Sequence, residues 1–157
     1  MEQENNEYTI KAYIFVHGAL SGSQRAVQAS HAVAEIFPKY LIEDHPSIKR
    51  DMLLDWVDIH KTIILLNGGF SKSLRDTYDS IRECALGLCL PHANFYEDGA
   101  TMEGMMTSFM VIVPSTCILS ESKCEEVEFM MKNRMKIDRG EKCRYNLTKI
   151  LSSHRLA

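Results

Sequence analysis

The chain has 157 residues, with 18 Lys and Arg against 21 Asp and Glu, and a formal net charge of −3. This length suits one compact domain, and a composition that is 45% hydrophobic and 25% charged excludes a disordered chain, a collagen-like repeat and a disulfide scaffold. The slightly negative charge argues against broad, charge-driven nucleic-acid binding but leaves room for a local basic groove.

The first elements alternate between a strand and helices. Tyr8–Val16 is rich in β-branched and aromatic residues and predicts a strand, followed by a loop with two glycines and two serines. A helix follows, with Ser21 or Ser23 as its cap. Pro38 and the stretch Glu43–Pro46 are expected to end or kink this helix. Its predicted apolar face comprises Ala26, Val27, Ala29, Val33, Ile36 and Phe37.

A second short helix is expected over Ser47–Val57. Lys61–Leu66 is a nearly continuous apolar run, which predicts a strand buried on both faces. Asn67–Gly69 ends this strand, and Ser71 or Ser73 is then expected to cap a helix that reaches about residues 84–88.

The second half of the chain predicts two strands and two helices. Ala93–Glu97 and Ser108–Val113 are the strands, separated by an Asp-Gly turn. Ser120–Lys132 is a helix, with Ser120 and Ser122 as candidates for its cap. A last helix is expected around Glu141–Leu151.

The order β-α-α-β-α-β-β-α predicts an α/β fold, a three-layer sandwich around a central four-stranded sheet that is mixed and mostly parallel. Residues 1–133 would form this domain, and residues 134–157 would be a basic C-terminal extension or arm. Because an arm with few local partners suits docking on a neighbour, we expect a homodimer or homotetramer.

The cysteine pattern and the apolar runs indicate the compartment. Five cysteines without CxxC spacing favour neither a zinc site nor a disulfide framework, so we expect no metal, no cofactor and a reducing cytoplasm. The acidic, polar start is unlike a signal peptide, and no apolar run approaches the ~20 residues of a membrane helix, so no membrane partner is expected.

Three polar loops follow or precede the predicted strands: His17–Gln24, Asn67–Ser71 and Asp98–Thr107. In α/β folds, ligands bind at the carboxyl ends of the strands. We therefore expect the functional site where these loops meet.

The start of the first helix is the strongest candidate for anion binding. Free backbone N–H groups and the positive helix end face the loop, and Ser21, Ser23, Gln24 and Arg25 add donors. Gln28 lies one turn deeper and can read a polar edge. An ordinary capped helix explains the same residues and, taken alone, is the better explanation.

The other two loops have equally plain alternatives. The backbone at Asn67 and Gly68 can approach a ligand closely, or simply form a tight turn, and the two readings have equal weight. Asp98 can be a site residue or a turn residue. Met102 belongs to a methionine-rich loop that can pack against a base.

Two motifs resemble the archaeal and eukaryotic class of peptidyl-tRNA hydrolases. The segment Ala26-Val27-Gln28-Ala29-Ser30-His31-Ala32 is similar to that family's helix Ala-Ala-Gln-x-x-His-Ala. Glu97-Asp98-Gly99-Ala100-Thr101, with Thr107–Pro114 after it, is similar to its second motif. The resemblance covers about residues 8–132 and implies that family's α/β fold.

The chain departs from this family at its cations. The family's loop lysine aligns with Gln24, the preceding lysine with Gly22, and the arginine of the second motif with Ala100. Because ester cleavage needs charge stabilisation where the oxyanion develops, these losses argue against hydrolysis. If the chain is a hydrolase, the resemblance implies Asp98, Thr101 and Gln24 as its catalytic residues.

We therefore expect a non-enzymatic protein that binds a small nucleotide. Proteins resembling this fold occur in bacteriophages, and by analogy the chain would be a phage sponge for a cyclic-nucleotide immune signal, located in the host cytoplasm. The alternative is an active peptidyl-tRNA hydrolase that binds tRNA, with Arg25 or Lys11 replacing the lysine; a third is an interaction module. The expected ligand-binding residues are His17, Ser21, Ser23, Gln24, Arg25, Gln28, Asn67, Gly68, Asp98, Thr101 and Met102.

Overall fold

The computed structural model describes residues 7–42, 47–98 and 104–157. Its elements follow the chain in the order β1 (Ile10–Val16), α1 (Gly22–Leu41), α2 (Ile48–Asp55), β2 (Thr62–Asn67), α3 (Ser71–Gly87), β3 (His92–Glu97), β4 (Met105–Pro114), α4 (Glu121–Lys132) and α5 (Arg139–Ser153). A π-helical turn, Trp56–His60, continues α2, and a 3₁₀ turn, Ser115–Cys117, follows β4. The predicted α/β class is confirmed.

The four strands form one mixed sheet in the order β2-β1-β4-β3. Only β1 and β2 are parallel neighbours, whereas β4 is antiparallel to both β1 and β3. The expectation of a mostly parallel sheet is therefore wrong. Helical crossovers do orient β1, β2 and β3 in the same direction, but β4 lies between β1 and β3 and makes two of the three pairings antiparallel.

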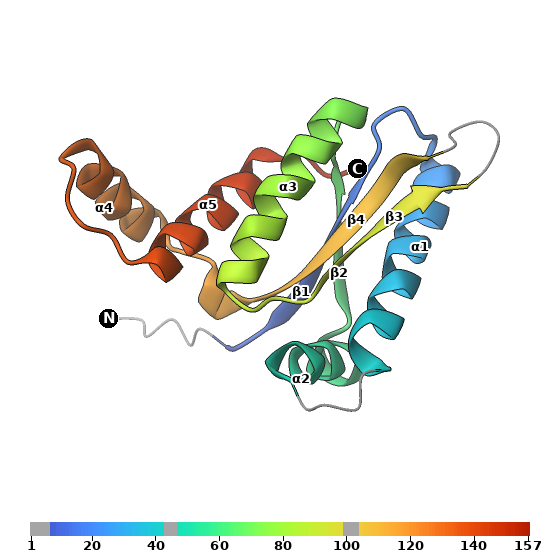
Figure 1. Ribbon diagram of the computed structural model, residues 1–157, viewed down its shortest axis with the longest axis horizontal. Coiled ribbons are helices and arrows are strands. Elements are labelled where there is room, and N and C mark those ends of the chain that lie inside the picture. Colours follow the sequence, from blue (N-terminus) through green and yellow to red (C-terminus); the bar gives the residue numbers. More distant parts are fainter. Residues whose placement is uncertain (1–6, 43–46, 99–103) are drawn as a thin grey trace.

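Helices cover both faces of the sheet and give three layers (Figure 1). On one face, α1, α2 and Trp56 of the turn that continues α2 pack over buried Ile14 and Ile112. On the other, α3 and α5 pack over Phe15 and Phe109, whose stacked rings lie 4.5 Å apart between centroids.

The prediction that Lys61–Leu66 is a strand buried on both faces is wrong, because β2 lies at an edge of the sheet and Leu66 is its one buried residue. The Ile63 side chain is 51% exposed. The C-terminal residues pair along the carboxyl half of this edge: the Asn67 N–H donates to the Arg155 carbonyl (2.9 Å), and the Ala157 N–H donates to the Leu65 carbonyl (3.0 Å). An apolar run alone does not reveal whether a strand is central, because a covered edge buries part of it in the same way.

The last helix belongs to the core and is not a free arm. Leu147 and Leu151 of α5 are buried in the same cluster as Leu74 and Ile81 of α3. The argument that residues 134–157 need a neighbouring subunit therefore loses its basis, and a homodimer or homotetramer stays a prediction.

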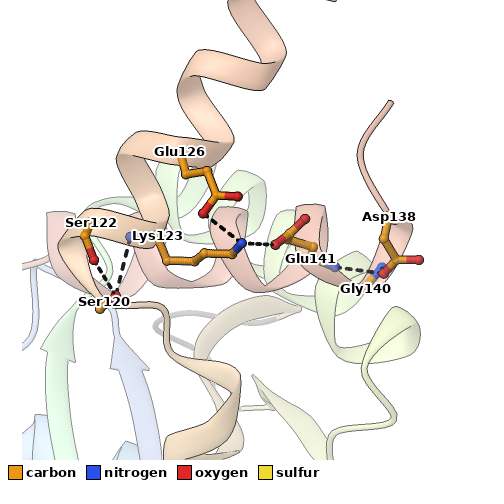
Figure 2. Close-up of polar contacts among 7 residues, drawn as sticks. All are labelled: Ser120, Ser122, Lys123, Glu126, Asp138, Gly140 and Glu141. Carbon is orange, nitrogen blue, oxygen red and sulfur yellow. Dashed lines mark hydrogen bonds and ion pairs between the residues drawn. The ribbon is translucent and has the colours of Figure 1, made fainter. Parts of the chain in front are cut away.

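The helix α4 projects from this body (Figure 1). Lys123 joins it to α5, with Nζ 2.9 Å from Glu126 Oε2 and 3.0 Å from Glu141 Oε1 (Figure 2). Ser120 caps α4, as expected, and Asp138 caps α5 by accepting from the Gly140 and Glu141 N–H groups.

The predicted apolar face of α1 is confirmed in part. Ile36 is buried, and Ala29, Val33 and Phe37 pack partly buried against the same cluster. Ala26 and Val27 are exposed, and Gln28 and Ala32 are buried instead. The helix also passes through Pro38 and ends at Leu41. A polar side chain occupies the buried face because the sheet supplies hydrogen-bond partners for it, and an apolar periodicity cannot show this.

Candidate functional site

The first two predicted loops meet, as expected, where β1 and β2 end and β4 begins, and Thr107 at the end of the third lies against them; residues 99–103 of that loop lie outside the described residues. The His17 N–H donates to the Thr107 carbonyl (2.9 Å), and the Gly18 N–H donates to the Gly69 carbonyl (2.7 Å). We call this region the loop junction; it comprises residues 17–28, 67–71, 97–98 and 104–108. The first candidate site lies here.

The first turn of α1 uses its donors and acceptors internally. Ser21 is the N-cap, as predicted, and both its N–H and its Oγ donate to Gln24 Oε1, at 2.9 and 3.0 Å. The Arg25 guanidinium donates to the carbonyls of Leu20 (2.9 Å) and Gly18 (3.2 Å). Ser23 is exposed, with its Oγ 3.4 Å from that of Ser21. Gln24 and Arg25 thus brace the loop that was expected to bind an anion.

Gln28 is 8% exposed and lies at the centre of a buried polar network. Its Nε2 donates to Glu97 Oε2 (2.7 Å), and its Oε1 accepts from Thr107 Oγ1 (2.6 Å). The Ser108 hydroxyl donates to the Gln28 backbone carbonyl (2.7 Å). These bonds join α1 to β3 and β4, so Gln28 holds the layers together.

His17 and Ser71 lie close enough to suggest a nucleophile and its base. His17 Nε2 is 3.0 Å from Ser71 Oγ, but His17 Nδ1 accepts the Ala19 N–H at 3.2 Å. Burial lowers the pKa of His17, so the neutral ring carries its proton on Nε2, facing the serine. The Ser71 hydroxyl in turn donates to Met105 Sδ (3.1 Å). A base must present an unprotonated nitrogen to the hydroxyl, so this pair is not arranged for nucleophilic attack.

This use of Ser71 also corrects a predicted cap. Neither Ser71 nor Ser73 caps α3, because Phe70 occupies the N-cap position. Met105 and Met106 lie on β4 rather than in a loop, and Met106 is 3% exposed.

The Asn67–Gly69 turn is packed tightly. Asn67 Oδ1 accepts the Gly69 N–H (2.9 Å), and the Gly68 N–H donates to the Val16 carbonyl (2.9 Å). A Cβ added to Gly68 would overlap the Leu74 side chain. Close packing against α3 therefore explains this glycine, and the tight-turn reading is favoured.

Three of the predicted ligand-binding residues remain to be placed. Asp98 is exposed at the end of β3. Thr101 and Met102 lie outside the described residues.

A second candidate site, missed by the sequence analysis, runs along the outer edge of β3 between α1 and α3. It is a groove of about 910 Å³, which we call the basic groove. Its lining comes from the end of α1, the start of α2, one face of α3, and β3. The lining residues are Lys39, Tyr40, Ser47, Ile48, Lys49, Tyr78, Asp79, Arg82, Leu86, Cys89, His92, Asn94 and Tyr96.

Positive charge gathers in this groove. Lys39 Nζ donates to the His92 carbonyl (2.8 Å) and lies 5.4 Å from the centre of the Tyr40 ring, while Lys49 Nζ lies 5.8 Å from it. Desolvation by burial, followed by the nearby charges of Lys49 and Arg82, lowers the pKa of Lys39. In the part of the chain that the structure describes, no carboxylate pairs with any of these three cations.

The edge of β3 is neutral and well hydrogen-bonded. The Tyr40 hydroxyl donates to the His92 carbonyl (3.1 Å) and accepts the His92 N–H (3.2 Å). Burial is the main cause that lowers the pKa of His92 to about 4, with the neighbouring cations adding to it, so this ring is uncharged at neutral pH. The Tyr78 hydroxyl donates to Asn94 Oδ1 (3.1 Å), and Tyr96 is 42% exposed.

These residues are far apart in the sequence, which explains why the groove was missed. The local signals are weak: the Lys39-Tyr40 pair at the end of a helix, and Tyr78 and Arg82 at i, i+4 spacing on another. Only the packing of α1, α2 and α3 around the edge of β3 brings them to one surface.

Within residues 7–42, 47–98 and 104–157, no three His, Cys, Asp or Glu side chains gather as ligands for a metal ion. No helix there combines the length and apolarity required to span a bilayer. Comparisons with known proteins find no matching family and no matching curated protein.

Proposed function

We propose that this protein binds a small nucleotide in the basic groove and leaves it chemically unchanged. The observation that carries the proposal is the convergence of Lys39, Lys49 and Arg82 beside tyrosine rings. Cations attract phosphate, and an exposed aromatic face stacks on a base, so the two parts of a nucleotide find complementary surfaces.

The charge of the whole chain strengthens this reading. A net charge of −3 provides no general attraction for anions, so three cations that form no ion pair with a carboxylate among residues 7–42, 47–98 and 104–157 are a local exception. The groove volume of about 910 Å³ falls within the roughly 300–1,000 Å³ of small-molecule sites.

The loop junction supports binding without hydrolysis. The family's loop lysine corresponds to Gln24, whose amide caps α1, and His17 faces Ser71 with its protonated nitrogen. A protein that holds a nucleotide unchanged would sequester it, which agrees with the analogy to a phage sponge for a cyclic-nucleotide immune signal.

Titration calorimetry with mononucleotides and cyclic dinucleotides tests binding. We expect saturable binding of at least one of them, weakened at least tenfold by Arg82→Ala and by Lys49→Ala, because a charge-assisted hydrogen bond contributes about 1.5–3 kcal/mol. Lys132→Ala, which removes one exposed cation from the projecting helix α4, is the matched control and should bind like the wild type. Equal affinity of all three variants would place the site elsewhere.

A cleavage assay with peptidyl-tRNA tests the alternative function. We expect no turnover. Cleavage at rates typical of enzymes, roughly 1–10³ per second, would establish a hydrolase and overturn the proposal.

A further inference from the structure

One acidic side chain lines the basic groove and needs an explanation. Asp79 lies one helical turn before Arg82 on α3 and is exposed. Within the described part of the chain it forms no ion pair with any cation. A carboxylate beside a phosphate site opposes anion binding, so its presence fits a different part of the ligand. Its two oxygens can accept two parallel N–H groups.

Asn94 faces the same groove with a defined polarity. The Tyr78 hydroxyl donates to Asn94 Oδ1 at 3.1 Å, which occupies the acceptor of this amide. The two N–H donors of Nδ2 have no acceptor among the described residues, so they are available to a ligand oxygen. The bond from Tyr78 therefore orients the Asn94 amide so that its N–H₂ group acts as a donor to the ligand.

A carboxylate and an amide donor that line the same groove distinguish the bases. The edge of guanine carries two adjacent donors, N1–H and the N2 amine, next to the acceptor O6. Adenine presents the reverse order, with a donor at N6 and an acceptor at N1, and uracil offers only one N–H. Guanine alone matches both oxygens of a carboxylate and the N–H₂ of an amide.

We infer that the basic groove selects a guanine nucleotide, with the Asp79 carboxylate accepting from N1–H and N2–H, and the Asn94 amide donating to O6. The exposed ring of Tyr96 stacks on the base, and Lys39, Lys49 and Arg82 receive the phosphate. This inference rests on the proposed function and adds the identity of the base to it.

Titration calorimetry with GMP, AMP and UMP tests the selectivity. Wild-type protein should bind GMP at least tenfold more tightly than AMP, with UMP between them, because a site built to hydrogen-bond a group rejects analogues that lack it. Asp79→Asn should weaken GMP binding at least tenfold and leave AMP binding within about twofold, since one charge-assisted contact contributes about a factor of ten or more.

A second nucleotide, chosen to match the Asp79→Asn variant, tests whether residue 79 contacts the base directly. Xanthosine monophosphate carries an oxygen where guanine carries the N2 amine. The new amide of Asp79→Asn can donate to that oxygen, so this variant should prefer XMP to GMP, the reverse of the wild type. Asp76→Asn makes the same change one helical turn earlier, outside the groove, and should keep the wild-type order. Unchanged thermal unfolding shows that each variant is folded.

The outcomes separate the two proposals. If GMP, AMP and UMP bind equally and Arg82→Ala weakens all three, nucleotide binding in the groove stands and guanine selection is overturned. If no nucleotide binds at millimolar concentration, both are overturned.

Discussion

The loop junction and the basic groove both gather polar side chains beside the sheet, but they use them differently. In the loop junction, Gln24, Arg25 and Gln28 each hydrogen-bond to other groups of the protein. In the basic groove, Lys49 and Arg82 have no carboxylate partner within the described residues. A polar group that is satisfied internally stabilises the fold, whereas an unpaired charge at a groove remains available to a ligand.

This difference changes how the sequence motif is read. The Gln28 segment resembles a hydrolase motif, yet its glutamine joins three elements of the fold. Structural demands alone therefore account for the residue. The groove carries no motif, and it is identified by cations that have no carboxylate partner in the described part of the chain.

The largest expected effect is loss of stability in the loop junction. Gln28→Leu removes the acceptor of the fully buried Thr107 hydroxyl and the donor to Glu97. Because an unsatisfied buried group costs about 1–3 kcal/mol, the free energy of unfolding in urea should fall by about 3 kcal/mol, with nucleotide affinity unchanged in the folded protein. Ser23→Ala, on the exposed turn of the same helix, should cost little. A stable Gln28→Leu variant that no longer binds would move the ligand site to the loop junction.

The next largest expected effect is a pH dependence of folding stability, and its source is His92 in the basic groove. His92 is neutral in the folded protein because its pKa lies at about 4, while the unfolded chain takes up a proton near pH 6.5. The unfolded state binds more protons in this window, so stability is full above about pH 6.5 and is lost as the pH falls toward 4. From pH 7 to pH 5 we expect a loss of about 1–2 kcal/mol by urea unfolding.

His92→Asn should flatten this slope, because an amide nitrogen can replace Nδ1, which lies 3.2 Å from the Leu90 carbonyl, without titrating. His17 titrates in the same direction and leaves a smaller residual slope. An unchanged slope in His92→Asn would assign the acid sensitivity to other groups.

Salt should change nucleotide affinity more than it changes folding stability, and this effect is smaller than the two effects above. Raising the ionic strength from about 0.05 to 0.5 M screens exposed charges, so nucleotide affinity should fall about fivefold by calorimetry. The buried network around Gln28 should respond little, and the unfolding midpoint should change less than the affinity does. Binding that is insensitive to salt would argue against phosphate contacts by Lys49 and Arg82.

The smallest effect is expected at a surface contact outside both regions. Lys123 bridges Glu126 and Glu141 between α4 and α5 (Figure 2). Exposed ion pairs contribute little, so Lys123→Ala should leave the unfolding midpoint nearly unchanged in calorimetric scans. A large drop would show that α4 depends on this contact for its position.

The local sequence pattern was sufficient to predict much of the fold. The strands at Ile10–Val16 and His92–Glu97 follow from β-branched and aromatic residues, and the caps Ser21 and Ser120 follow from hydroxyl side chains at helix starts. The meeting of the loops after β1 and β2 also follows, because successive crossovers place the carboxyl ends of these strands at one end of the sheet.

Long-range pairing could not be derived in this way. The insertion of β4 between β1 and β3 and the edge position of β2 depend on which strands pair, not on their composition. The docking of α5 through Leu147 likewise depends on a partner helix far away in the chain.

The sequence by itself determined the α/β class, most element positions and the loops that meet, because propensity, periodicity and capping act over a few neighbouring residues. The tertiary structure alone decided that Gln28 is buried and that Lys39, Lys49 and Arg82 share one groove. Whether a polar side chain is satisfied or left unpaired depends on partners tens of residues away, and only the packed layers bring those partners together.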